Sequence, residues 1–335
     1  MVHMSHNPGG TGVEWGEFCH LNQVKPSTKM AHGAFLPWDA SYDKATIQHS
    51  MDLFDKGKLV QIRLGNVESW HLACATLNFN CKLRSNTTAH YMQSNAGWFS
   101  TDKAMQRYVL SWWVNETLQA IRASSRPLLG GVSLPVDLLI WGSMGLKGPF
   151  ILWYSEGYVA LMHHILQSSD DKEILFIGAA TQSFRLALER PSGGLQSYYT
   201  FRVSNFSWKL VHLPQTAGAP STSMYRSSID VIQATLREVR RAAPNFDTAV
   251  LACGAYAMPL INMLRKHYPG RNLLQLSSAV YDFFGINTRS KNFSQSPPKR
   301  NKQGIALTRP ENAIDAAERY VPSLHASIDH GKYWA

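Results

Sequence analysis

One segment constrains the fold of this chain more than any other: DTAVLACGAYAMPLINMLRKHYPGRNLLQLSS, at residues 247–278. The apolar run at 249–252 predicts a buried strand, and Gly254 breaks it. A helix is expected over 258–266 and a second strand over 273–276. A strand, a loop, a helix and a strand in this order are typical of parallel α/β sheets.

The loop that opens at Gly254 is expected to lie at the carboxyl end of its strand. Ligands bind at that edge of open parallel sheets, and free N–H groups at a helix N-terminus favour phosphate. The loop therefore predicts a site for a phosphorylated ligand, with a nucleotide favoured. The sequence has neither a dinucleotide fingerprint nor a Walker A loop. An ordinary tight turn, in which Gly254 only permits a close bend, is the alternative.

Strands and helices alternate along the rest of the chain. Helices are expected over 43–56, 70–80, 101–123, 182–190 and 223–243, and strands over 59–64, 135–143, 174–177 and 208–213. This alternation predicts an α/β fold, Rossmann-like, with a mainly parallel sheet and helices on both faces. Residues 1–30 are expected to form a flexible lead, and residues 31–335 a single domain.

Composition narrows the class of protein. Of 335 residues, 44% are hydrophobic and ten are Trp, which is enough for a substantial core. No apolar run reaches the roughly 18–20 residues of a membrane span, and the N-terminus lacks the apolar core of a signal peptide. A soluble, cytoplasmic protein is therefore expected. The four cysteines form no CxxC pair and no Cys/His metal spacing, so buried free thiols are predicted.

The formal net charge of +10 leaves two kinds of partner open. A basic surface suits nucleic acid, and it suits anionic small substrates or glycans as well. The basic residues are mostly scattered, with clusters at 237–241 and 299–302. A nucleic-acid-binding protein is therefore an alternative, and not the favoured one.

Chemically capable residues follow the strand expected at 59–64, in the sequence RLGNVES. Arg63 can pair with a phosphate. Glu68 can ligate a hard divalent cation or act as a base, and Gly65 and Asn66 form the turn between them. The alternative is a strand-end turn in which Arg63 and Glu68 form a local ion pair.

A second polar segment is QSNAGWF, which places Gln93, Ser94 and Asn95 beside Trp98 and Phe99. Amide and hydroxyl groups next to aromatic faces suit sugar recognition. A turn with two aromatic anchors is the alternative.

Together these segments resemble the glycosyltransferases with the GT-D fold. RLGNVES is similar to their R-x-G-[DN]-x-E element, QSNAGWF to a TNAGF-like segment, and LACGAYAMPL to a stretch that reads LGAGAYGLPL. ILFIGAATQSF, HLPQTAG and the terminal HGKYWA match in the same order, so the resemblance spans about residues 59–334. It implies transfer of a sugar from a nucleotide-sugar donor, by default a UDP-sugar, to a hydroxyl of a glycan or glycoprotein acceptor.

The resemblance also implies where the donor binds. Backbone N–H groups of Gly254, Ala255 and Tyr256, and the Tyr256 phenol, are expected near the donor diphosphate. Gly65 and Asn66 are expected to complete this donor site. Another Rossmann-like transferase, such as a methyltransferase, and a catalytically inactive glycan-binding relative are the alternatives.

The chemistry that it implies rests on two side chains. Arg63 is expected to stabilise the leaving diphosphate, and Glu68 to act either as the base or as the ligand of Mn²⁺ or Mg²⁺. Gln93 and Asn95 are expected to bind substrate. The family pattern has an acidic pair, Asp-x-Glu, where this chain has Asn66 in the first place. One negative charge is lost there, which makes Asn66 a doubtful metal ligand and puts metal dependence in question.

Overall fold

The computed structural model describes residues 40–76, 92–93, 96–124, 126–129, 137, 140–141, 143–144, 151–152, 156–190, 193–214, 224–276, 279–287 and 314–315. The lead expected at 1–30 lies outside these residues. No helix in this described part is long and apolar enough to cross a membrane.

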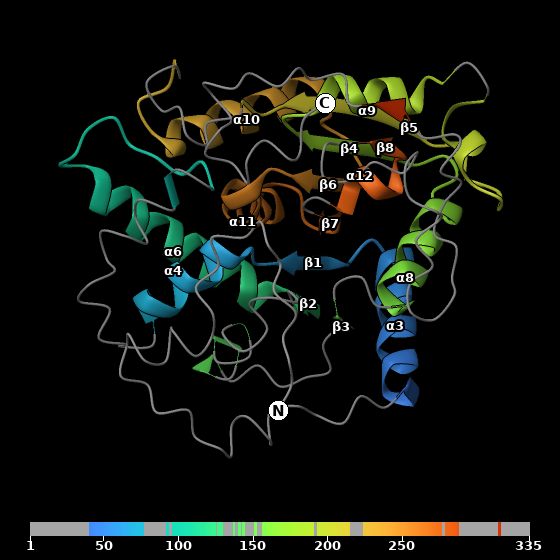
Figure 1. Ribbon diagram of the computed structural model, residues 1–335, viewed down its shortest axis with the longest axis horizontal. Coiled ribbons are helices and arrows are strands. Elements are labelled where there is room, and N and C mark those ends of the chain that lie inside the picture. Colours follow the sequence, from blue (N-terminus) through green and yellow to red (C-terminus); the bar gives the residue numbers. More distant parts are fainter. Residues whose placement is uncertain are drawn as a thin grey trace.

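The centre of the molecule is a seven-stranded sheet in the order β3-β2-β1-β7-β6-β4-β5, and every pairing is parallel (Figure 1). Its strands are β1 Val60–Arg63, β2 Arg126–Leu129, β3 Ile151–Leu152, β4 Glu173–Gly178, β5 Ser207–His212, β6 Thr248–Ala252 and β7 Asn272–Gln275. The short strands β8 (Ile286–Asn287) and β9 (Ile314–Asp315) pair separately. The predicted α/β fold with a parallel sheet is confirmed.

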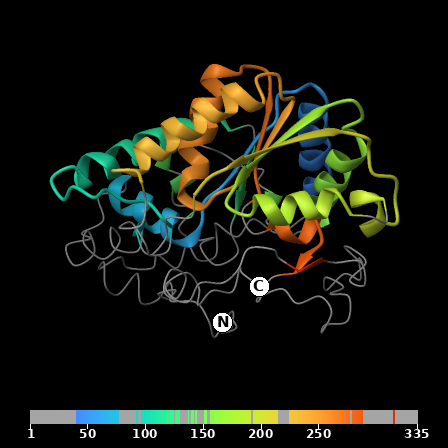
Figure 2. The ribbon, with the colours of Figure 1, turned by 90° about the horizontal axis from the view of Figure 1, so that it is seen from above.

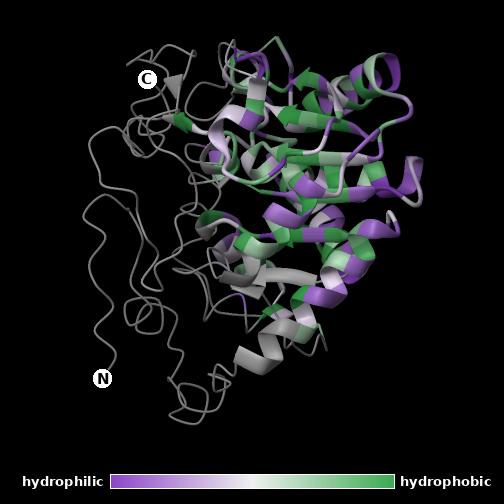
Figure 3. Cartoon of the chain, turned by 90° about the vertical axis from the view of Figure 1, so that its right-hand side faces the viewer, coloured by the Kyte–Doolittle hydropathy of each residue, from purple (hydrophilic) through white to green (hydrophobic). Residues whose placement is uncertain are grey.

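Strands β4, β6 and β7 are buried along almost their whole length. Strands covered on both faces carry continuous apolar runs, which is why EILFIG, TAVLA and NLLQ form the middle of this sheet. Figure 3 shows these strands as largely hydrophobic, with polar residues on the outer helices.

Helices cover both faces of the sheet. The first layer is α4 Asn66–Thr76, α6 Gln106–Ala123, α10 Ser228–Ala242 and α11 Ala257–His267; the second is α3 Ala40–Asp55, α8 Glu156–Gln167, α9 Thr181–Leu188 and α12 Ala279–Phe283. The two layers contribute to two separate clusters of buried apolar side chains. Figure 2 shows them on opposite sides of the strands.

Strand β7 brings distant parts of the chain together, because it lies between β1 and β6. The side chain of Asn272 accepts a hydrogen bond from the Leu59 N–H at 2.9 Å and donates to the Phe54 carbonyl at 3.0 Å. These bonds join residues that are more than 200 positions apart in sequence and fix the middle of the sheet.

The strand predicted at 135–143 is wrong. The described residues there, Asp137, Ile140, Trp141 and Ser143, are helical, and the Met144 N–H donates to the Ile140 carbonyl at 3.1 Å. Asp137, Ile140 and Trp141 are fully buried. Their spacing is that of one helix face, so this apolar run is the buried face of a helix. The actual strand of this region, β2, precedes it.

Cysteine usage also differs in part from the prediction. Cys253 is a buried free thiol, as predicted. Cys74, at the end of α4, is disulfide-bonded. The prediction of buried free thiols is therefore wrong for Cys74.

Candidate functional site

The predicted site residues that follow β1 and β6 lie at the carboxyl edge of the sheet. Because all strands run in parallel, the loops after β1 and β6 open at the same edge. One strand, β7, lies between them, so the two loops are about 10 Å apart. Figure 1 shows β1, β6 and β7 pointing toward this edge.

Arg63 is the last residue of β1, and only 8% of its surface is exposed. Its backbone N–H donates to Oε1 of Gln275, the last residue of β7, at 3.2 Å. This bond ties the end of β1 to the end of its neighbour. The structure thus places a buried guanidinium at the edge where ligands of parallel sheets bind.

Glu68 lies in the first turn of α4. The helix begins directly after Gly65, whose carbonyl accepts from the Ser69 N–H at 2.9 Å. The Glu68 carboxylate folds back and occupies the space that a side chain at position 65 would need. A Glu at the third helical position is the capping-box arrangement, and the helix dipole favours its charge. Glu68 therefore has a local structural role whatever its chemistry, and a side chain at position 65 would displace its carboxylate.

Two buried residues near Glu68 were not predicted. Asp137 is fully buried and accepts a hydrogen bond from the Ser69 hydroxyl at 2.5 Å. Its signal in the sequence is an acid inside the apolar run PVDLLIW. His71 lies one helical turn after Glu68 and is 9% exposed.

The surroundings of His71 are apolar. Its ring meets the edge of Trp113, on α6, with centroids 5.7 Å apart. Among the described residues its Nδ1 has no hydrogen-bond partner. Burial lowers the pKa of His71 to about 4, so its imidazole is neutral at pH 7.

The loop after β6 is a single 3-10 turn, η3 Gly254–Tyr256, that leads into α11. Gly254 has φ +52°, which side chains rarely adopt, and it is exposed. The Tyr256 N–H donates to the Cys253 carbonyl at 3.1 Å. Within the described residues the N–H groups of Gly254 and Ala255 donate to no other backbone group. Of these two residues Gly254 is exposed, and Ala255 is buried behind it.

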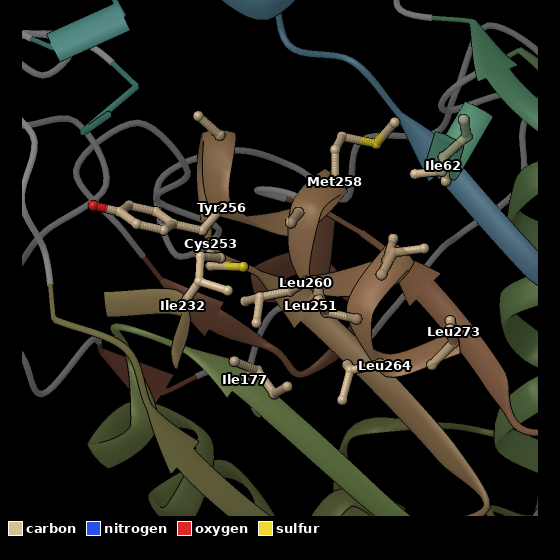
Figure 4. Packing of buried hydrophobic residues seen from close by; sticks show 14 of the residues in the cluster. Ile62, Ile177, Ile232, Leu251, Cys253, Tyr256, Met258, Leu260, Leu264 and Leu273 are labelled. Atoms are coloured by element: carbon tan, nitrogen blue, oxygen red, sulfur yellow. The ribbon is translucent and has the colours of Figure 1, made fainter. Parts of the chain in front are cut away.

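The side chains of this loop face the interior. Tyr256 is 2% exposed, and its hydroxyl donates to the Gly97 carbonyl at 2.8 Å and lies 3.0 Å from the Ser228 hydroxyl. The Trp113 indole N–H donates to the Ala255 carbonyl at 2.8 Å. Figure 4 shows Cys253 and Tyr256 at one end of β6, above the packing of Leu260 on Leu251. The phenol predicted near the donor is therefore engaged inside the protein.

The bond from Tyr256 to Gly97 brings the segment QSNAGWF to the same loop. A Cβ added at Gly254 would lie 3.4 Å from the Ala96 carbonyl oxygen. Trp98 and Phe99 are fully buried, so they act as aromatic anchors and offer no exposed face to a sugar. Gln93 is half-buried, and Asn95 lies outside the described residues.

The structure thus places Arg63, Gly65 and Glu68 at the loop after β1. Gly254, Ala255 and Tyr256 lie at the loop after β6, two strands away across the sheet. Asn66 is the first residue of α4, and the structure describes its backbone only. Nowhere in the described part do three His, Cys, Asp or Glu residues form a group that could hold a metal ion. Glu68 could supply one carboxylate to an Mn²⁺ or Mg²⁺ ion.

Comparisons with family models, with curated proteins and with solved structures found no match to this chain.

Proposed function

We propose that this protein is a glycosyltransferase that moves a sugar from a nucleotide-sugar donor, with a UDP-sugar favoured, to a hydroxyl of a glycan acceptor. The observation that carries the proposal is the pairing of two loops at one sheet edge. One loop carries the backbone N–H groups of Gly254 and Ala255, which donate to no backbone carbonyl of the described residues, and the other carries Arg63 and Glu68.

The donor diphosphate is assigned to the loop after β6. Backbone N–H groups at the start of a helix bind phosphate, because they point at the ligand and the helix dipole favours negative charge. Gly254 is exposed there and has no side chain to block a close approach. Ala255 and Tyr256 contribute through the backbone and through packing, since both side chains are buried.

The transfer is assigned to the loop after β1. Glu68 accepts the proton of the acceptor hydroxyl as its oxygen attacks the anomeric carbon. The new glycosidic C–O bond forms while the C–O bond to the diphosphate breaks, and the electron pair leaves with the diphosphate. Arg63 offsets the negative charge that grows on this leaving group. A single displacement of this kind inverts the anomeric configuration.

Thermal unfolding with UDP, GDP, CMP and dTDP tests this proposal. A ligand present at 100 times its Kd adds about 2.7 kcal/mol to the free energy of unfolding. In a chain of this length that raises Tm by about 2–4 °C. Each nucleotide is added with and without Mn²⁺, because one carboxylate and the donor phosphates are a common arrangement around such ions. No shift with any of the four would contradict the proposal.

A further inference from the structure

A groove lies along the open edge of the sheet, beside β5. It has a volume of about 390 Å³, and it is lined from three elements: by Thr181 and Arg185 of α9, by His212 of β5 and by Glu238 of α10. A second hollow of about 370 Å³ shares Thr181 and Arg185 and continues along α9. Pockets of about 300–1,000 Å³ are typical of small-molecule sites. Figure 1 shows α9 and α10 beside β5.

One end of the groove opens at the carboxyl edge of the sheet. Thr181 is the first residue of α9 and His212 the last of β5, and their side chains approach to 3.5 Å. Only β4 separates β5 from β6. The groove therefore lies about 10 Å from the loop at Gly254.

Small residues lie between the groove and the loop at Gly254. The chain that leaves β4 reads Gly178, Ala179, Ala180 before α9 begins. Helix α9 leaves the sheet on one face, and α11, which follows β6, on the other. Chains that part in this way form the crevice in which open α/β sheets bind ligands.

The charge of the lining suits an anion. Arg185 is exposed, and no carboxylate of the described residues pairs with it. The one acid of the lining, Glu238, already receives two hydrogen bonds from Arg241, at 2.9 and 2.5 Å. The guanidinium of Arg185 and the hydroxyl of Thr181 are thus the groups available to a phosphate.

We propose that the groove holds the nucleoside and the α-phosphate of the donor nucleotide. This inference rests on the proposed function and deepens it. Thr181 and Arg185 bind the α-phosphate, and the β-phosphate reaches across the loop 178–180 to the N–H groups at Gly254. The nucleoside lies between β5 and α10, where Leu210 and Tyr225 provide apolar surface.

The test is calorimetric titration of the full chain with UDP and with GDP. Arg185→Gln removes the cation, and Arg237→Gln is the matched control, because Arg237 is an exposed residue of α10 outside the groove. Loss of one charge-assisted contact is expected to raise Kd about tenfold in Arg185→Gln. Arg237→Gln is expected to bind like the wild type. Both replace exposed side chains, and an unchanged Tm in the absence of nucleotide checks their folding.

Hydrogen exchange with the same nucleotides gives a second readout. Bound nucleotide is expected to slow exchange in residues 181–186 and 207–212, which line or adjoin the groove. If UDP or GDP binds but Arg185→Gln matches the control and these residues are not protected, the groove inference is wrong and the proposed function stands. If Arg185→Gln weakens nucleotide binding and Arg237→Gln does not, but the wild type transfers no sugar, the groove inference is supported and the proposed transferase activity is wrong. If none of UDP, GDP, CMP and dTDP binds the wild type, both the groove inference and the proposed function fail.

Discussion

At the scale of single residues, Glu68 combines two roles that substitution can separate. A Gln at its position can still close a capping box, but it cannot accept a proton as a carboxylate does. Glu68→Gln is therefore expected to keep the free energy of unfolding near that of the wild type. Sugar transfer should fall about 10²- to 10⁴-fold if Glu68 is the general base.

Turnover in a nucleotide-release assay measures this loss, and Glu189→Gln is the control. Glu189 is exposed at the end of α9, away from the site. Glu68→Ala should lose about 1 kcal/mol of stability as well as activity, because it removes the cap. Wild-type turnover in Glu68→Gln would exclude Glu68 from the chemistry.

Residues were harder to predict than their segments. The sequence pointed to Tyr256, but the groups that engage its phenol, Gly97 and Ser228, come from other parts of the chain. Asp137 and His71 were missed for the same reason, since nothing local reveals that a polar side chain is buried.

At the scale of elements, the turn η3 depends on the left-handed backbone of Gly254. Ala at a positive φ costs about 1–2 kcal/mol, and its Cβ would also meet the Ala96 carbonyl. Gly254→Ala is expected to lower the free energy of unfolding by about this amount and to weaken nucleotide binding, because the N–H groups that bind phosphate shift.

The control for this variant is Gly270→Ala. Gly270 has φ +75° and open space around it, and it follows α11 at the other end of that helix. It should lose similar stability, measured by urea unfolding, and keep nucleotide binding, measured by calorimetry. Equal loss of nucleotide binding in the two variants would mean that the backbone at Gly254 does not bind the nucleotide.

Elements with a strong local pattern were predicted to within a few residues. Strand β6 and helix α11 are marked by an apolar run, a glycine and a second periodicity. The helical residues at 137–143 were mistaken for a strand because a short apolar run fits both structures. Strand β3 has only two residues, too few for any periodicity to show, and β2 reads RPLL, in which a Pro argues against a strand.

At the scale of the whole molecule, His71 makes stability depend on pH. Its folded-state pKa of about 4 lies below the ordinary 6.5, so the unfolded chain binds the proton more tightly. Above pH 6.5 the neutral His71 lowers the stability of neither state, so the protein keeps its full free energy of unfolding. This free energy decreases as pH falls from 6.5 toward 4, because the unfolded chain takes up a proton that the folded protein does not. The slope approaches about 1.4 kcal/mol per pH unit between these values.

Urea unfolding at pH 7, 6 and 5 measures this slope. His71→Gln, which carries no titrating group, should show a smaller loss of stability over the same interval. Parallel pH profiles for the wild type and the variant would mean that His71 is not held neutral in the folded protein.

The central position of β7 has a consequence for how this protein forms on the ribosome. β1 is made early, yet one of its two neighbours, Asn272–Gln275, is made more than 200 residues later. Folding driven by contacts so distant in sequence is slow. Until β7 emerges, β1 cannot join β6, and the nascent chain holds the two loops of the candidate site on unconnected halves. Binding competence therefore arrives late in synthesis, and until then the apolar edges of β1 and β6 are substrates for chaperones.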